Sequence, residues 1–418
     1  MEMYLNKEII QPYREQIVNR IREKHFRQNE CYNGRLFLIS TTYPGYWLEH
    51  VFDSIVWAKL YPEDSDLASS QVRLFLKNQR EDGRIPCCIF DNEIMNSIPG
   101  LAKVYTGQDV CPPGFTTKYS QLQECVSIAS LCLEAWEINQ SEDLEWYYNC
   151  CSKWDEWLCN NRMTRNKGLV ETFCGFDTGH DNSGRFAGMK YKTDACRIAS
   201  EFSDGYPVDC DVAPLISPDV NAVFYGSRTA LSKMADILGK KEEANMWRNK
   251  AADVKSRLIE TCFDPESCFF YDVDKHDQKI YVKSISITTL FCEHLLDNEM
   301  ADEIYTRYLS NPKEFATPYP FPGTSISDPA WQQNSKREFL GVLFARQCCI
   351  TYYSLDGILW KERGNAADYA KMGFRLVSTW DSTFWTRITS SYRRTFYMFR
   401  MVFDYNDVLI ILDENARN

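Results

Sequence analysis

Pairs of helices repeat along this chain, and this repetition most limits the folds open to it. Apolar residues recur every three to four positions, as Ile10, Tyr13, Ile17 and Ile21 do near the N-terminus, and this spacing places them on one helix face. Short turns, one of them at Gly239, separate several of the expected helices. Repeated antiparallel pairs predict an all-α fold, a toroid of helical hairpins. We expect helices at 7–27, 46–60, 64–79, 121–139, 142–160, 221–238, 241–262, 284–295 and 298–310.

Long connections separate the helix pairs and are rich in Gly, Pro and aromatic residues. We expect them at 80–120, 162–220 and 311–333. Connections of this length in a compact protein are commonly functional, and their aromatic content argues against disorder. They should gather at one mouth of the toroid and form a pocket. The segment 268–282 alternates polar and apolar residues and predicts a short β-hairpin.

Charge and composition exclude several classes of partner. The net charge of the 418 residues is -11 and no block of Lys and Arg is present, so we expect no nucleic-acid partner. A charged N-terminal segment and the lack of an 18-residue apolar run predict a soluble, cytoplasmic protein with no membrane partner. The 17 cysteines are odd in number and scattered, a pattern that favours buried free thiols over disulfides or zinc sites.

No motif for a metal or cofactor stands out, and we expect neither. Asp272, Asp274 and Asp277 lack the glycine and distal glutamate of a calcium loop, which favours a hairpin turn. The five histidines show no zinc spacing. The chain also lacks a Gly-rich phosphate loop and a G-x-S-x-G elbow.

Carboxylates, amides and guanidinium groups occur beside Trp and Tyr in several segments. This mixture suits a small carbohydrate, because aromatic faces cover the C–H side of a pyranose while polar groups bind its hydroxyls. Each residue also has a structural alternative: Asp219 could cap a helix and Trp47 could lie in the core. Tyr46 and Trp47 are the candidate platforms, and the full candidate set for sugar binding is Tyr46, Trp47, Asp53, Gln79, Arg84, Gln123, Glu124, Asn182, Arg185 and Asn221.

The segment "FCGFDTGHDNSGRF", residues 173–186, is the most specific motif. Hydrolysis of a glycoside needs a protonated carboxylic acid at the glycosidic oxygen and a second carboxylate that activates water. Asp181 is our candidate for the acid, and the neighbouring glycines let the backbone approach a ligand closely. The alternative is a loop in which Asp177 and Asp181 cap helices.

"GFDTGHDNSGRF", "SPDVNAVFYGSRTALSKMADILGK" and "TPYPFPGTSISDPAW" resemble segments of the six-hairpin glycosidases, the group that includes trehalase, mannosyl-oligosaccharide glucosidase and mannosylglycerate-hydrolase-like enzymes. The resemblance covers roughly residues 40–332 and implies an (α/α)6 barrel that inverts configuration with water as the nucleophile. It implies the general acid at Asp181. The segment "VFDS" resembles one that carries a sugar-binding aspartate, which falls on Asp53.

The resemblance stops after residue 332, although the general base of the family lies in its last hairpins. We therefore expect a catalytic region at 1–332 and a C-terminal segment at 333–418 that should close the barrel but departs from the family. Divergence, a truncated toroid and a one-nucleotide shift in the coding sequence are the alternatives.

Back-translation supports the shift. Codons allowed for "NSKREFLG" and "FWTRITSSYRRT", when read one base later, give "IQKENSWG" and "FGHELHPHTGEP". These strings resemble the Asn-Ser-Trp-Gly signature and the base-bearing loop of the family. The Arg387 codon overlaps the codon expected for the catalytic glutamate, so the chain as written would lack its base.

These patterns together predict an inverting glycoside hydrolase for a small α-linked glycoside, a disaccharide or a glycosyl-glycerate. The alternative is a catalytically silent, sugar-binding α/α toroid that lacks its general base. A toroid of the prenyltransferase or cyclase kind would need a zinc triad or an Asp-rich diphosphate motif, and the sequence contains neither.

Overall fold

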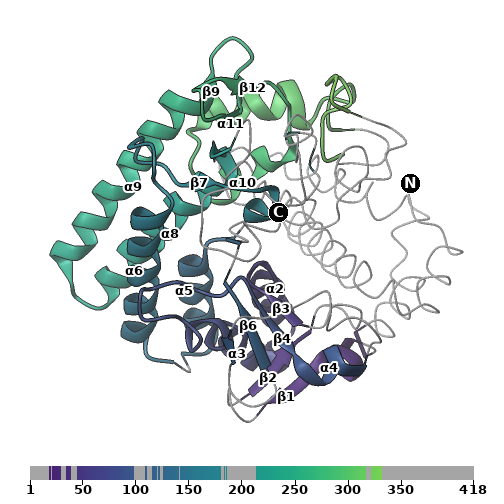
Figure 1. Cartoon of the computed structure of the whole chain (residues 1–418), viewed down its shortest axis with the longest axis vertical. Helices are drawn as coiled ribbons and strands as arrows, with labels where there is room; N and C mark the ends of the chain where they lie inside the picture. Colours follow the sequence, from purple (N-terminus) through teal and green to yellow (C-terminus); the bar gives the residue numbers. More distant parts are fainter. Residues whose placement is uncertain are drawn as a thin grey trace, which may run out of the picture.

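Helical hairpins form the frame of the protein, as a computed structural model shows (Figure 1). The helices of the first three hairpins are α2 (Val51–Leu60) with α3 (Asp66–Leu76), α5 (Ile128–Asn139) with α6 (Leu144–Asn161), and α8 (Pro218–Ile237) with α9 (Lys241–Cys262). A shorter pair follows, α10 (Thr288–Cys292) and α11 (Asn298–Ile304), and a π-helical turn at Tyr305–Leu309 extends α11. The structure describes residues 18–19, 21–29, 34–38, 45–97, 109–110, 115–119, 121–122, 126–140, 142–179, 183, 185, 213–316 and 322–331.

The hairpins lie side by side along an arc. α2, α5, α8 and α10 contact one another in this order, and α3, α6 and α9 pack on their outer side (Figure 1). The described part of the chain is mostly helical, as the sequence predicts. The expected helices at 142–160 and 241–262 correspond closely to α6 and α9. The helix expected at 46–60 begins later, because a strand and a 3-10 turn precede α2.

Local signals explain where the helices begin and end. Ser127 and Asp143 cap α5 and α6, because their side chains accept hydrogen bonds from the backbone N–H groups of the first turn. Gly239 lies between α8 and α9 with a φ of +75°, a conformation that glycine adopts without steric cost. The hairpin turn predicted at this glycine is confirmed.

Two four-stranded antiparallel sheets lie among the long connections. One has the strand order β3-β4-β6-β5 and the other the order β12-β11-β8-β7. Their strands are β3 (Gly45–Trp47), β4 (Cys88–Asp91), β5 (Asp109–Val110), β6 (Phe115–Lys118), β7 (Glu171–Thr172), β8 (Leu215–Ile216), β11 (Asp272–Val273) and β12 (Lys279–Ile280). The pairing of β11 with β12 confirms the hairpin predicted within 268–282.

The sheets depart from the expectation of irregular loops at 80–120 and 162–220. Their strands are two to four residues long, too short to show a repeating pattern. Two separate strand pairs and several short helices complete the described elements: β1 (Phe26–Asn29) with β2 (Gly34–Phe37), β9 (Phe263–Asp264) with β10 (Phe269–Phe270), η2 (Leu48–His50), η3 (Pro62–Asp64), α4 (Asn92–Ser97), η5 (Gly175–Thr178) and η7 (Ile285–Ile287).

The core fills the space between the inner and outer helices. Trp154 and Trp157 of α6 stack at a centroid distance of 5.2 Å, and both are buried. All ten described cysteines are free and eight of them are buried, which confirms the prediction of buried free thiols for these eight. No helix within the described ranges is long and apolar enough to cross a membrane. The cytoplasmic location stays a prediction.

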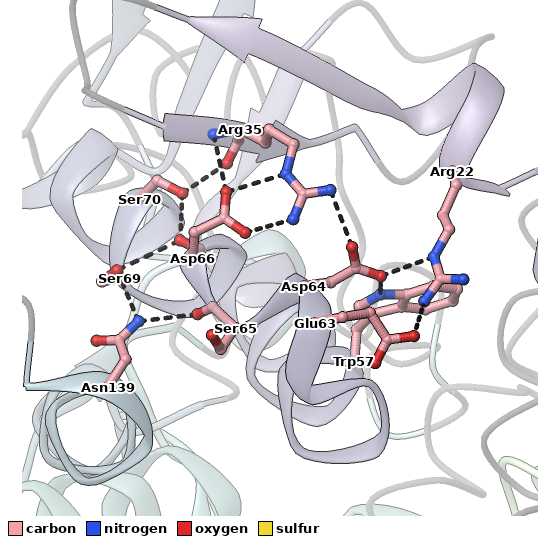
Figure 2. A network of polar contacts seen from close by, with 10 residues as sticks. All are labelled: Arg22, Arg35, Trp57, Glu63, Asp64, Ser65, Asp66, Ser69, Ser70 and Asn139. Carbon is pink, nitrogen blue, oxygen red and sulfur yellow. Dashed lines mark hydrogen bonds and ion pairs between the residues drawn. The ribbon is translucent and has the colours of Figure 1, made fainter.

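A shared carboxylate fixes the N-terminal strands to the turn between α2 and α3 (Figure 2). Asp64 is 3% exposed and accepts hydrogen bonds from Trp57 Nε1 at 3.0 Å, Arg22 Nε at 2.8 Å and Arg35 Nη1 at 2.9 Å. Burial by itself would raise the pKa of this carboxyl, but hydrogen bonds from these three side chains outweigh burial and lower the pKa. Arg35 also bonds to Asp66 of α3.

Candidate active site

The segment with the Gly-His-Asp-Asn-Ser-Gly motif is anchored before residue 181 by a buried ion pair. Asp177, which is wholly buried, accepts hydrogen bonds from the backbone N–H groups of Phe173 and Leu122, both at 2.7 Å. It also accepts a hydrogen bond from the N–H of Cys174 at 3.4 Å and pairs with Arg162 Nη1 at 2.6 Å, from the residue that follows α6. Asp177 therefore joins the motif segment to α6, a stronger attachment than the helix cap that we considered from the sequence.

A second buried ion pair anchors the segment after residue 181. The Arg185 guanidinium binds both carboxylate oxygens of Asp219, at 2.8 Å and 2.6 Å. Its Nη1 also lies 3.2 Å from Ser286 Oγ and 3.4 Å from Asp272 Oδ1. Asp219 belongs to the first turn of α8, Ser286 to η7 and Asp272 to β11. One guanidinium thus holds three elements together.

Asp181 and Asn182 lie outside the described residues. Asp181 is four positions along the chain from Asp177 and four from Arg185.

The carboxyl groups around Arg185 are electrostatically unequal. Asp219 has the two-point pair with the guanidinium, whereas Asp272 has the single longer contact. Burial raises the pKa of Asp272 to about 6; the attraction of Arg185 opposes this shift and the repulsion of Asp219 adds to it. The site therefore holds a carboxyl group whose pKa is raised above its usual range, chiefly by burial.

The candidate platforms Tyr46 and Trp47 lie next to each other on β3 but in different environments. Trp47 is half-buried, and its ring packs edge-on against Phe90 at 5.9 Å. Tyr46 is 1% exposed and packs in the core beside Phe115. The prediction of a sugar platform at Tyr46 is therefore corrected, because a buried ring offers no free face. Asp53 is 2% exposed in the first turn of α2.

Asn221, predicted to bind a sugar hydroxyl, bonds to the protein backbone instead. Its Oδ1 accepts a hydrogen bond from the N–H of Val170, and its Nδ2 donates to the carbonyl oxygens of Val170 and Ser217. The side chain is wholly buried. Asn221 thus joins α8 to the chain just before β7, and the prediction of direct sugar contact is corrected to a supporting role.

Arg84 and Gln79 also bond to the backbone. Arg84 is wholly buried; its guanidinium lies 4.3 Å from the ring centroid of Trp157 and donates to the carbonyl oxygens of Tyr119 and Gln121. Gln79 Nε2 donates to two backbone carbonyl oxygens, at 2.8 Å and 2.9 Å. Direct sugar contact by Arg84 is therefore corrected in the same way. Gln123 and Glu124 lie outside the described residues.

Sequence reasoning missed the partners that hold the motif segment. Arg162 and Ser286 were not among the candidates, and Asp272 was interpreted only as part of a hairpin turn. Asp272 and Arg185 are 87 positions apart, so no local pattern could have joined them. Within the part of the chain that the structure describes, no cluster of His, Cys, Asp and Glu could hold a metal ion.

Solved structures with the same fold include two of the GH63 mannosylglycerate hydrolase from Thermus thermophilus. The complex with Tris and D-glycerate has a TM-score of 0.65 and 15% identity, over 93% of this chain and 100% of that chain. The complex with glucose has a TM-score of 0.61 and 15% identity, over 87% and 89%. Neutral trehalase Nth1 from Saccharomyces cerevisiae has a TM-score of 0.61 and 10% identity, over 94% and 77%. At these identities the likeness shows the fold alone.

A curated relative, an uncharacterized protein of Borreliella burgdorferi, is 23% identical over 150 residues. The aligned part is 36% of this chain, and it spans 30% of the length of that relative.

A family model supplies the assignment. The mannosylglycerate hydrolase MGH1-like glycoside hydrolase domain matches residues 48–385. The matched range contains both buried anchors and Asp181, and it continues past residue 332, where the resemblance traced from the motifs ends. The six-hairpin glycosidase superfamily predicted from the motifs is thereby confirmed. The chain belongs to the MGH1-like glycoside hydrolase family, named for mannosylglycerate hydrolase.

Proposed function

We propose that this protein is an inverting hydrolase of a small α-linked glycoside and that Asp181 is its general acid. One observation carries the proposal: within a glycoside hydrolase family domain, buried ion pairs at Asp177 and Arg185 hold the motif segment on both sides of Asp181. A catalytic acid must be kept in a fixed position relative to the glycosidic oxygen. Two anchors at equal distances along the chain meet this requirement.

In the proposed reaction Asp181 donates its proton to the leaving oxygen while a second carboxylate activates water on the opposite face of the sugar. Asp181 must stay protonated near neutral pH, and burial beside other carboxyl groups raises a pKa in the required direction. Trp47 is the proposed sugar platform, and Asp53 binds hydroxyls. Gln123, Glu124 and Asn182 complete the proposed binding set. Gln79, Arg84 and Asn221 have a supporting role, because their side chains hydrogen-bond to the backbone.

The substrate class that we propose is a glycosyl-glycerate or an α-linked disaccharide. The fold neighbours support it, since their names are mannosylglycerate hydrolase and trehalase. We also propose an (α/α)6 barrel, in which residues 1–332 form the catalytic region and residues 333–418 are the segment expected to close the ring, although this segment departs from the family.

Hydrolysis and anomeric outcome test the proposal directly. The purified chain is incubated with mannosylglycerate, glucosylglycerate and trehalose, and proton NMR follows the sugar released. From the two glycerates we expect the β-sugar to appear first, because inversion converts an α-glycoside into a β-sugar. Trehalose should give α- and β-glucose in equal amounts, because its leaving glucose keeps the α configuration. Asp181→Asn should lower kcat by about 10²- to 10⁴-fold, with sugar binding retained. The matched control is Asp277→Asn, which changes an exposed carboxylate and should leave kcat unchanged. Unchanged turnover in Asp181→Asn would refute its role.

A second function, a silent sugar-binding toroid, is favoured by the offset reading of the tail. If Arg387 occupies the position of the base, water is not activated and the chain binds sugar without hydrolysing it. Binding without turnover in the same substrate panel would support this alternative.

Sequencing the gene across codons 330–418 tests the cause of such a loss. A one-base correction that restores the glutamate should also restore hydrolysis. If the gene contains no shift, and its sequence read one base later does not match the family, the hypothesis of a one-nucleotide shift is wrong.

A further inference from the structure

The Arg185 guanidinium contacts two carboxyl groups, and the two sets of contacts are unequal. Both of its Nη atoms bind Asp219, whereas Asp272 has one contact of 3.4 Å from Nη1, the atom that also donates to Ser286. Arg185, Asp219, Asp272 and Ser286 are each no more than 5% exposed. Water does not screen the charges in this cluster.

The balance between one guanidinium and two carboxyl groups indicates that Asp272 is the group that carries a proton. Within the described residues, one guanidinium faces two carboxyl groups, so ionising both aspartates leaves a net negative charge on this buried set, which is costly. Asp219 has the two-point pair with Arg185. The described groups that act on Asp272 are Arg185, Asp219 of α8, Ser217 at the start of α8 and the Cys262 thiol of α9. Arg185 is the cation among these described groups, and protonating Asp272 makes the set of Arg185, Asp219 and Asp272 neutral.

We propose that Asp272 is a positioning residue for the general acid and controls the Arg185 anchor through its own protonation. When Asp272 is neutral, the Arg185 guanidinium keeps its two-point pair with Asp219 and holds the motif segment in its working position. When Asp272 ionises, its carboxylate competes with Asp219 for Nη1 and draws the guanidinium toward β11. This rearrangement changes the attachment point four residues from Asp181. The inference rests on the proposed role of Asp181 and adds a pH-sensitive control to it.

The neutral arrangement matches the geometry seen. An ionised carboxylate beside a guanidinium forms short, charge-assisted bonds of about 2.7–2.9 Å, and the contact to Asp272 is longer than this. Burial raises the pKa of Asp272 to about 6, so the exchange between the two arrangements falls in a pH range where enzymes can be assayed.

The pH profile of kcat is the first test. In the wild-type protein we expect kcat to fall at least threefold between pH 5 and pH 7.5 through an ionisation near pH 6. Asp272→Asn keeps the shape of the protonated carboxyl and should remove this ionisation while preserving the kcat seen at low pH. The matched control is Asp277→Asn, an exposed carboxylate of the same β-hairpin, which should keep the wild-type profile. Identical profiles in the wild-type protein and Asp272→Asn would overturn the proposal.

A second measurement does not depend on activity and so separates this inference from the proposed function. Hydrogen–deuterium exchange of a peptide covering residues 173–190 is followed from pH 5 to pH 7.5 and corrected for the intrinsic tenfold rise per pH unit. We expect the corrected protection to fall at least threefold above pH 6 in the wild-type protein but not in Asp272→Asn. If no variant hydrolyses any glycoside, this result still supports the anchor control while the glycosidase proposal fails. If Asp272→Asn does not fold, the pH dependence of the corrected protection in the wild-type protein tests the inference by itself. A corrected protection that does not change between pH 5 and pH 7.5 would contradict it.

Discussion

Replacing Asp177 measures how much a buried ion pair contributes to the free energy of unfolding. The carboxylate is wholly buried and accepts hydrogen bonds from three backbone N–H groups and from Arg162. Asp177→Asn keeps the size of the side chain but removes its charge, which leaves the Arg162 guanidinium buried without compensation. Removing one partner of a buried pair typically costs about 3–5 kcal/mol. We expect a loss of about 4 kcal/mol in the free energy of unfolding.

The assay is equilibrium urea unfolding at pH 7, followed by tryptophan fluorescence. The matched control is Asp277→Asn, whose carboxylate is 55% exposed and pairs with Lys167 at 3.0 Å. Exposed pairs contribute at most about 1 kcal/mol, so the control should lose far less stability than Asp177→Asn.

A double-mutant cycle isolates the ion pair itself. Arg162→Met removes the cation, and in the Asp177→Asn background it also removes the uncompensated charge. The loss in the double variant should therefore be smaller than the sum of the two single losses by at least about 1 kcal/mol, within the range seen for groups in direct contact. A loss below about 1 kcal/mol for Asp177→Asn, or additive losses, would refute the view that this pair anchors the segment.

Two further predictions concern the N-terminal half. The pKa of Asp64 is lowered in the folded state, so its ionised form contributes stability that is present above the unfolded pKa of about 3.8 and is lost as the pH falls through the lower folded pKa. The urea midpoints of the wild-type protein and Asp64→Asn should therefore differ at pH 6 and converge toward pH 2. A constant difference between the two midpoints would contradict the prediction. Gly45→Ala places a Cβ 2.3 Å from the backbone oxygen of Ile89, so β4 must shift, and we expect a loss of about 1–3 kcal/mol together with a changed tryptophan signal from Trp47. At Gly239, where a Cβ has nothing within 4 Å, Gly239→Ala should cost only the strain of its positive φ, about 1–2 kcal/mol, without a change in that signal.

The helical frame was accessible from sequence because helix periodicity is local. α9 covers the predicted residues 241–262, since its apolar positions recur within a single stretch of chain. The sheets were not accessible. Glu171 of β7 pairs with Ile216 of β8, 45 positions away, and each strand has two residues. Pairing between such short strands is determined by tertiary contacts, not by a pattern within either strand.

The candidate site shows the same limit at the level of single residues. Arg185 was predicted as a site residue, and a helix cap was the structural alternative for Asp219, but their ion pair depends on a contact across 34 positions. Arg84 and Asn221 have side chains that suit sugar hydroxyls and backbone carbonyls equally well. Their burial and their hydrogen bonds to the backbone distinguish the two uses. The role of Asp181 stays a prediction.

The order of the hairpins has a consequence for how the protein is made. α2, α5, α8 and α10 each contact the next inner helix along the chain, so an arc of this kind can form in the order in which the ribosome releases it. By the time residues 333–418 are translated, the hairpins from α2 to α11 have already left the decoding centre. A change of reading frame after residue 333 would therefore alter the last part of a chain whose earlier hairpins have already been released in an order that lets each inner helix contact the next.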